Sequence, residues 1–327
     1  MLGFIIKRVL GMIPSLAAIS VLAFIVIQLP PGDFVTTLVA QAAEAGDTID
    51  DAKMAVLRQR YGVGDPILVQ YFRWIGGILQ GDFGYSFEWN QPVSQLVWER
   101  MGMTSLMSFI TLMFIWAIAL PIGIYSAVNK YSFGDYAATL FGFIGMATPN
   151  FLLAIVLMYI STIWFGNSVG GLFSPEYVKA DWSLAKIWDF AKHIWIPVLV
   201  LGTAGTAALI RVMRANLLDE LNKPYVEAAR AKGLPEVKLI LSYPVRVAIN
   251  PFISTVGWVL PTLISGELIV STVLNLPTAG PLLLQALKSQ DMFLAGAFLL
   301  MIGALVLIGT LLSDILLAII DPRIRLS

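Results

Sequence analysis

The sequence predicts an all-α polytopic membrane protein with six transmembrane helices. Hydrophobic residues make up 58% of the 327 residues and charged residues only 13%, whereas soluble domains are roughly 45–50% apolar and about 25% charged. Several windows exceed ~18 residues with few or no charges, which is the length that a helix needs to cross the hydrocarbon layer. With no cysteine and one histidine, the chain offers neither disulfides nor a histidine-based metal cluster.

Apolar windows predict where each span lies. The six spans are predicted at residues 9–30, 101–128, 137–165, 194–216, 245–272 and 292–320. The first has the charged-then-apolar start of a signal peptide, but its 22 apolar residues lack an A-x-A cleavage site. We therefore expect it to remain as a span. The proline in "ATPN", Ala147–Asn150, predicts a kink in the third span.

The distribution of charge predicts that both termini are cytoplasmic. With the N-terminus inside, the cytoplasmic segments hold twelve basic and seven acidic residues, and the outer segments hold nine and fourteen. This agrees with the positive-inside rule, and so does an even number of spans. The net charge of zero and the lack of a basic tract give no indication of nucleic-acid binding.

Residues 31–100 form a polar segment that is too long for a simple connector, so they are expected to have their own structure. Three helices are predicted there, from "TIDDAKMAVLRQRYG", "DPILVQYFRWIGGILQG" and "QPVSQLVWERMG", and the third runs into the second span. Trp74, Trp89 and Trp98 suit the outer membrane interface. The segment is predicted to be an outer insertion that meets a substrate-delivering protein, seals the outer face, or does both.

The most basic cytoplasmic loop, residues 217–244, is predicted to contain two short helices joined by a glycine. Pro224 suits a first helical turn, strong helix formers follow, and Gly233 ends the first helix. Glu227 and Arg230 are spaced to support the turn as a pair. Such a segment is rigid enough to receive force from a soluble partner. On charge alone it could instead be an anchor under the positive-inside rule.

Several motifs resemble one family of membrane proteins over essentially the whole chain. "EAARAKG" matches the EAA-x3-G loop of permease subunits of bacterial ATP-binding-cassette (ABC) importers. "PPGDF" after the first span, "ATPNFLLA" in the third, "LPTAGPLLLQAL" after the fifth and the ending "LLSDILLAIIDPRIR" resemble the dipeptide, oligopeptide and nickel permeases. The resemblance implies the type I ABC importer permease fold, an inner-membrane location, and binding-protein-dependent import by alternating access.

The resemblance also implies partners and a contact site. In that family the EAA loop forms a coupling helix that docks in a groove of the ATPase subunit. ATPase coupling is therefore expected of Tyr225, Glu227, Ala228, Ala229, Arg230, Lys232 and Gly233. The implied partners are a second homologous permease subunit, so that a heterodimer is expected, two subunits that bind ATP and Mg, and a periplasmic or lipid-anchored substrate-binding protein.

The chain is not expected to be an enzyme or to carry a cofactor. It contains no G-x-x-x-x-G-K-[ST] phosphate loop, no nucleophile elbow and no HExxH pair. "GTAGTAALI" in the fourth span lacks the lysine of a phosphate loop and indicates close helix packing. His193 shares an outer loop with Glu176, Asp181 and Asp189, which we interpret as a solvated cluster and not as a metal site.

Polar groups in the predicted spans are candidates for the translocation path. Glu267 is ionisable at membrane depth, and it could face substrate, form a gating hydrogen bond or extend to the interface. Ser271 occupies the position where the similar permeases usually carry a glutamate, and Asn150 follows the proline of the third span. Arg211 and Arg214 at the inner end of the fourth span are expected to be anchors, and one of them is predicted to pair with Asp314 in the sixth span.

The predicted function is a pore-forming permease subunit that imports a peptide-class solute, with an oligosaccharide as the alternative. The departures from the family pattern around the end of the fifth span weaken any transfer of substrate identity. A secondary transporter would show two similar halves with paired broken helices and midplane charges, and no such repeat is found. A membrane scaffold without transport activity would have little use for the EAA-type loop.

Overall fold

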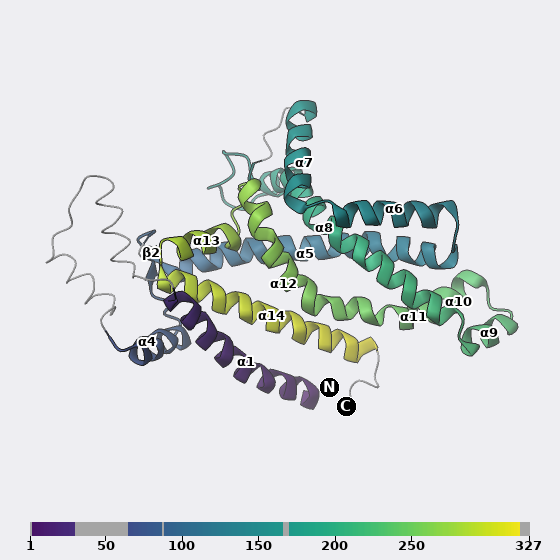
Figure 1. The fold of residues 1–327 in the computed structure, drawn as a ribbon, viewed down its shortest axis with the longest axis horizontal. Helices are drawn as coiled ribbons and strands as arrows, with labels where there is room; N and C mark the ends of the chain where they lie inside the picture. The colour runs from purple at the N-terminus through teal and green to yellow at the C-terminus, as the bar shows by residue number, and fades with distance from the viewer. Residues whose placement is uncertain (1, 30–64, 87, 166–169, 321–327) are drawn as a thin grey trace. The chain divides into compact units, whose positions relative to one another are not determined.

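The computed structural model is all-helical except for one two-stranded ribbon within the residues that it describes, which are 2–29, 65–86, 88–165 and 170–320 (Figure 1). The predicted helix in "TIDDAKMAVLRQRYG" and the "PPGDF" segment lie outside these residues. The chain divides into two compact units. The smaller unit contains residues 9–104 and 278–305, and the larger contains residues 1–8, 105–277 and 306–327.

The smaller unit combines the N-terminal helix with elements from two later parts of the chain, one before residue 104 and one after residue 278. It contains most of α1 (Leu2–Gln28), α4 (Ile67–Leu79), β1 (Tyr85–Ser86), β2 (Gln91–Pro92), the start of α5 (Val93–Val128), α13 (Ala279–Lys288) and the first half of α14 (Met292–Ile320). The predicted helix in "QPVSQLVWERMG" and the second span are one continuous helix, α5, as expected.

Contacts of two kinds, one apolar and one polar, attach α14 to other elements of the smaller unit. Trp74 of α4 is buried against Gly296 of α14, where an added Cβ would lie 2.8 Å from the indole ring. The Trp74 ring therefore packs inside this unit, where the absence of a side chain at Gly296 leaves room for it, and the predicted interface position of Trp74, Trp89 and Trp98 stays a prediction. At the other contact, buried Asp291 accepts hydrogen bonds from the Ser86 hydroxyl at 2.6 Å and from the Leu294 amide at 3.1 Å, which links the strand pair to the start of α14.

The larger unit is arranged around one long helix. Its elements are the rest of α5, α6 (Phe133–Ala147), α7 (Asn150–Phe165), α8 (Leu184–Leu221), α9 (Pro224–Ala231), α10 (Glu236–Ser242), α11 (Pro244–Ala248), α12 (Asn250–Val273) and the second half of α14. Helices α6, α7, α11 and α12 all pack against α8. Helix α8 is therefore the common partner in this unit.

Small residues bring the helices close to α8. Added Cβ atoms at Gly202 and Gly205 would lie 2.6 Å from Phe114 and 2.8 Å from Ile115 of α5. These two glycines belong to "GTAGTAALI", so the predicted role of that stretch in close helix packing is confirmed. On α6, an added Cβ at Gly145 would lie 2.8 Å from the Thr203 side chain of α8.

Within the described residues, four helices are long and apolar enough to cross a membrane: α1, α5, α8 and α14. Helices α6 and α7 meet that criterion only as a pair, which bends by 101°. Helix α12 has 24 residues, or about 36 Å at ~1.5 Å per residue. The polytopic helical architecture is confirmed, and the exact count of six spans stays a prediction.

The prediction of one kinked helix over 137–165 is wrong, because the structure has two helices there. Thr148 caps α6 in an extended conformation, with φ −83° and ψ 119°, and α7 starts at Asn150. Pro149 explains the break, because its ring excludes the helical conformation from the preceding residue and it has no N–H to continue the ladder.

Helix α8 starts ten residues before the predicted fourth span. The Ser183 hydroxyl caps it by accepting a hydrogen bond from the Lys186 amide at 3.2 Å. Asp189 and His193 consequently lie on this helix and are largely buried. The prediction that they belong to a solvated loop is wrong. The Asp189 carboxylate accepts hydrogen bonds from the Ser174 amide and hydroxyl, at 2.7 and 2.6 Å.

The close contact between α6 and α8 makes a matched pair of substitutions informative. At Gly145 an added methyl would collide with Thr203, whereas at Gly142 it would make an ordinary contact with Ala207 at 3.8 Å. We expect Gly145→Ala to lower the apparent melting temperature, because overpacking costs about 1–3 kcal/mol. Gly142→Ala should keep or raise it, because alanine favours helix over glycine by roughly 1 kcal/mol.

Thermal unfolding of the two purified variants in the same detergent provides the measurement. Equal melting temperatures for the two variants would contradict the close approach of α6 to α8 at Gly145.

Candidate functional site

The segment after α8 forms two short helices, α9 and α10, which we call the α9–α10 loop (residues 222–243; Figure 1). Pro224 stands in the first turn of α9, after the extended residue Lys223. Gly233 has φ +77°, a left-handed conformation that glycine adopts without strain, and α10 starts directly after Pro235. The predicted proline start, glycine stop and second helix are confirmed.

An ion pair closes the turn between the two helices. Arg230 of α9 donates to the Glu236 carboxylate from Nη2 at 2.6 Å and from Nε at 3.2 Å. Glu227, which is predicted to support the turn together with Arg230, adds a favourable charge interaction. The turn at Gly233 brings the start of α10 back to α9, so that Glu236 is the hydrogen-bonded partner of Arg230. The hydrogen bonds from Arg230 lower the pKa of Glu236 and raise that of Arg230. Both side chains are exposed, so the pair adds little stability.

A hydrogen bond attaches α9 to the last turn of α8. The Tyr225 hydroxyl donates to the Glu220 carboxylate at 2.6 Å. Partial burial, and then the Glu220 carboxylate, raise the pKa of the Tyr225 phenol. The phenol therefore keeps its proton at neutral pH and remains a donor. Helix α9 is thus held to α8 by the chain and by this bond.

The α9–α10 loop has an inner and an outer face. On the inner face, Val226 and Leu239 are fully buried, Ala229 is 7% exposed and Ile240 is also buried. The remaining predicted contact residues are exposed: Tyr225, Glu227, Ala228, Arg230, Lys232 and Gly233. Six of the seven predicted coupling residues are therefore available to a partner, while Ala229 packs inside the loop.

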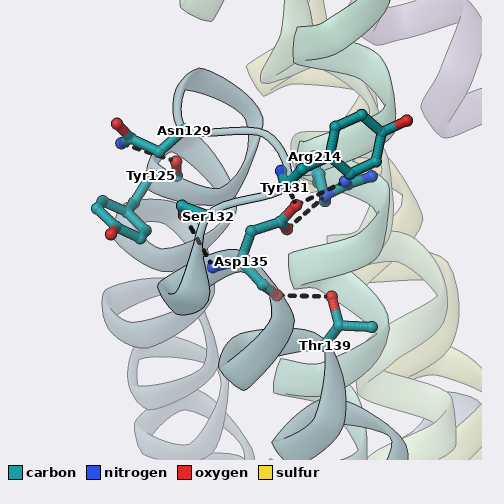
Figure 2. A network of polar contacts seen from close by, with 7 residues as sticks. All are labelled: Tyr125, Asn129, Tyr131, Ser132, Asp135, Thr139 and Arg214. Atoms are coloured by element: carbon teal, nitrogen blue, oxygen red, sulfur yellow. Dashed lines mark hydrogen bonds and ion pairs between the residues drawn. The ribbon is translucent and has the colours of Figure 1, made fainter.

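A second polar network lies between α6 and α8 (Figure 2). Arg214 of α8 donates to both oxygens of Asp135, from Nε and from Nη2, each at 2.8 Å. The Tyr131 amide also donates to Asp135, at 2.9 Å, and the Ser132 hydroxyl caps α6 by accepting from the Asp135 amide. The Asp135 side chain is only 3% exposed.

The partner predicted for Arg211 or Arg214 was Asp314, and this is wrong. Asp314 pairs with Arg8 at 3.3 Å. The connection from α5 to α6 instead places Asp135 beside Arg214. A sequence signal for this existed in "SFGD", because serine followed three residues later by an acidic residue is the start signature of a capped helix. It marks where α6 begins, although it does not identify the arginine.

The role of the three residues predicted for the translocation path stays a prediction. Ser271 is fully buried on α12, and Asn150 is the first residue of α7, directly after the bend. The side chain of Glu267 lies outside the described residues. No group of three His, Asp or Glu residues that could hold a metal ion occurs in the part of the chain that the structure describes.

The architecture and the sequence define a polytopic helical membrane protein. The family model "Binding-protein-dependent transport system inner membrane component" matches residues 119–326, and its N-terminal companion matches residues 1–108. The chain belongs to this family. It is therefore a multi-pass inner-membrane protein and a permease component of a binding-protein-dependent transport system.

Similar proteins extend over the full length of the chain. The oligopeptide transport system permease protein AppB of Bacillus subtilis is 34% identical, over 99% of this chain and 100% of its own. The glutathione transport system permease protein GsiC of Salmonella paratyphi A is 32% identical, and the dipeptide transport system permease protein DppB of Escherichia coli 29%, each over 99% of both chains.

The fold has a solved counterpart in the MetNI methionine ABC transporter. A chain of its inward-facing structure aligns with a TM-score of 0.52 and 16% identity, over 69% of this chain and 97% of its own. This likeness confirms the type I ABC importer permease fold.

The left-handed turn at Gly233 supports a prediction that separates backbone from side-chain effects. No atom lies within 4 Å of an added Cβ there, so a substitution acts through the backbone alone. Gly233→Val should distort the turn, because a left-handed conformation costs a branched residue about 1–2 kcal/mol. Gly233→Asn should be tolerated, because asparagine adopts this conformation readily.

The measurement is co-purification of the ATP-hydrolysing subunits with each variant. We expect Gly233→Asn to retain them and Gly233→Val to lose most of them. Equal loss in the two variants would mean that a partner requires a bare glycine surface, and equal retention would mean that the turn does not matter.

Proposed function

We propose that the chain is a pore-forming subunit of an ATP-driven importer of peptides. The observation that carries this proposal is the full-length similarity to AppB, an oligopeptide permease, at 34% identity. Two further relatives are named for the transport of a dipeptide and of glutathione, which is itself a tripeptide. Peptide is thus the solute class common to these relatives.

ATP hydrolysis is proposed to take place on separate subunits that contact the α9–α10 loop. The exposed face of this loop (Tyr225, Glu227, Ala228, Arg230, Lys232 and Gly233) would enter a groove of the ATP-binding subunit, and Ala229 would support it from inside. Helix α9 is roughly 12 Å long. Its bonds to α8 and α10 make it stiff, which favours the transmission of force.

The remaining assembly is proposed from the family and from the charge distribution. A second, homologous permease subunit would complete the pathway, because the spans of one chain are too few to surround a peptide-sized solute. Two ATP-binding subunits would lie on the cytoplasmic side together with both termini of this chain. A periplasmic or lipid-anchored binding protein would deliver solute to the outer side, where the insertion over residues 31–100 would meet it.

The proposed mechanism is alternating access. ATP binding would bring the two ATP-binding subunits together, and the α9–α10 loops of the two permeases would move with them. The helices attached to these loops would then change from inward-open to outward-open. Glu267, Ser271 and Asn150 are the candidates for the solute path, since they carry polar groups at membrane depth.

The proposal is tested by uptake into proteoliposomes that contain the complete complex and its binding protein. We expect ATP-dependent accumulation of radiolabelled dialanine or trialanine, and no accumulation with an ATP analogue that cannot be hydrolysed. Maltotriose provides the comparison with an oligosaccharide.

Uptake of maltotriose but of neither alanine peptide would overturn the solute class. Accumulation that proceeds without ATP and follows an imposed ion gradient would overturn the mechanism.

A further inference from the structure

We propose that the Asp135–Arg214 ion pair is a positioning link that makes α6 move as one body with α8 and the α9–α10 loop. The pair lies outside the loop that contacts the ATPase, and its role rests on the proposed function. Helix α6 would then follow the movement of α8 and transmit movement of the α9–α10 loop to the bend at Thr148.

The position of Arg214 on α8 suits this role. Arg214 lies seven residues before Leu221, where α8 ends, or roughly 10 Å along the helix axis. The α9–α10 loop follows directly and is bonded back to α8 through Tyr225 and Glu220. A displacement of the loop therefore reaches Arg214 within two helical turns.

The geometry of the pair restricts the orientation of α6. A bidentate contact of a guanidinium with a carboxylate has two parallel hydrogen bonds, so it fixes rotation as well as distance. Asp135 is further held by the amide of Tyr131, in the connection before α6. Movement of Arg214 is thus transferred to both the start of α6 and the turn that precedes it (Figure 2).

A second, independent contact joins α6 to α8 at the other end of α6. Gly145 lies so close to Thr203 that an added Cβ would be 2.8 Å from its methyl group, and Gly142 lies next to Ala207. The partners on α8 span from Thr203 to Arg214, about three turns. Two attachment points at this separation prevent α6 from pivoting on α8.

Helix α6 ends at the bend, and α7, which packs against α8 through contacts of its own, follows it. Thr148 is extended and α7 begins two residues later, so the helical hydrogen-bond ladder is interrupted there. A movement of α6 consequently arrives at the start of α7, which is Asn150. We infer that the ion pair contributes more to this rigid coupling than to the stability of the fold, because replacing both partners of a buried pair is often neutral for stability.

The test measures whether α6 and the loop keep a constant separation. The chain has no cysteine, so spin labels can be placed at Leu140→Cys on α6 and Val237→Cys on α10, both on exposed side chains. Distances between the labels are measured by pulsed EPR in the complete complex, first without nucleotide and then trapped with ATP and vanadate. In the otherwise unchanged chain we expect one narrow distance that is the same in both states.

Four variants and a control are compared in this background. We expect a second or shifted label-to-label distance in the trapped state for each of Asp135→Asn, Arg214→Gln and their combination. Arg214→Lys should give a smaller change in this distance, because lysine keeps the charge without the bidentate geometry. Arg211→Gln is the control, because it removes the same charge from an exposed position one turn earlier on α8.

The double variant separates a positioning role from a structural one. It leaves no unpaired buried charge, so its melting temperature should recover towards the parent value while the distance remains disturbed. An undisturbed distance in the double variant, or a disturbance equal to that of Arg211→Gln, would overturn the proposal. Failure of the proposed function would appear elsewhere, as absent peptide uptake by the unmodified complex.

Discussion

The close approach of neighbouring helices to α8 is the constraint on which the larger unit depends. Water is absent from the hydrocarbon layer, so apolar burial gives helices little reason to associate there, and packing between small residues takes its place. Gly202 and Gly205 allow α5 to approach α8 closely, and Gly145 allows α6 to do the same. Because the α9–α10 loop follows α8 directly, whatever acts on the loop acts first on the helix that most of this unit contacts.

Much of the architecture could be predicted from the sequence because its signals are local. The lengths of the apolar runs identify α1, α5, α8 and α14, and the stretch from Pro224 to Gly233 specifies α9 through a rigid start and a left-handed stop. The break at Pro149 was predicted only as a kink. Its 101° bend depends on how α6 and α7 each pack against α8, which no local pattern records.

Partners of charged residues were the weakest part of the prediction, because they depend on contacts between distant segments. Asp314 is predicted to pair with Arg211 or Arg214, whereas it pairs with Arg8, and Arg214 pairs with Asp135. The sequence likewise offers Arg230 a neighbour in Glu227 but does not indicate its ion pair with Glu236. Spacing along a helix could not indicate these partners, since one lies across two helices and the other across a turn. The solute path is less predictable still, because in the proposed assembly it would be shared with a second permease subunit.

The central claim is that the exposed face of the α9–α10 loop contacts an ATP-hydrolysing subunit, and cysteine protection tests it most directly. Ala228→Cys on α9 and Leu184→Cys at the far end of α8 are both exposed and can be placed singly in a chain that has no cysteine. The account predicts that adding the ATP-binding subunits to the purified permease slows maleimide labelling at position 228 and leaves position 184 unchanged. Equal labelling rates at position 228 with and without those subunits would contradict it.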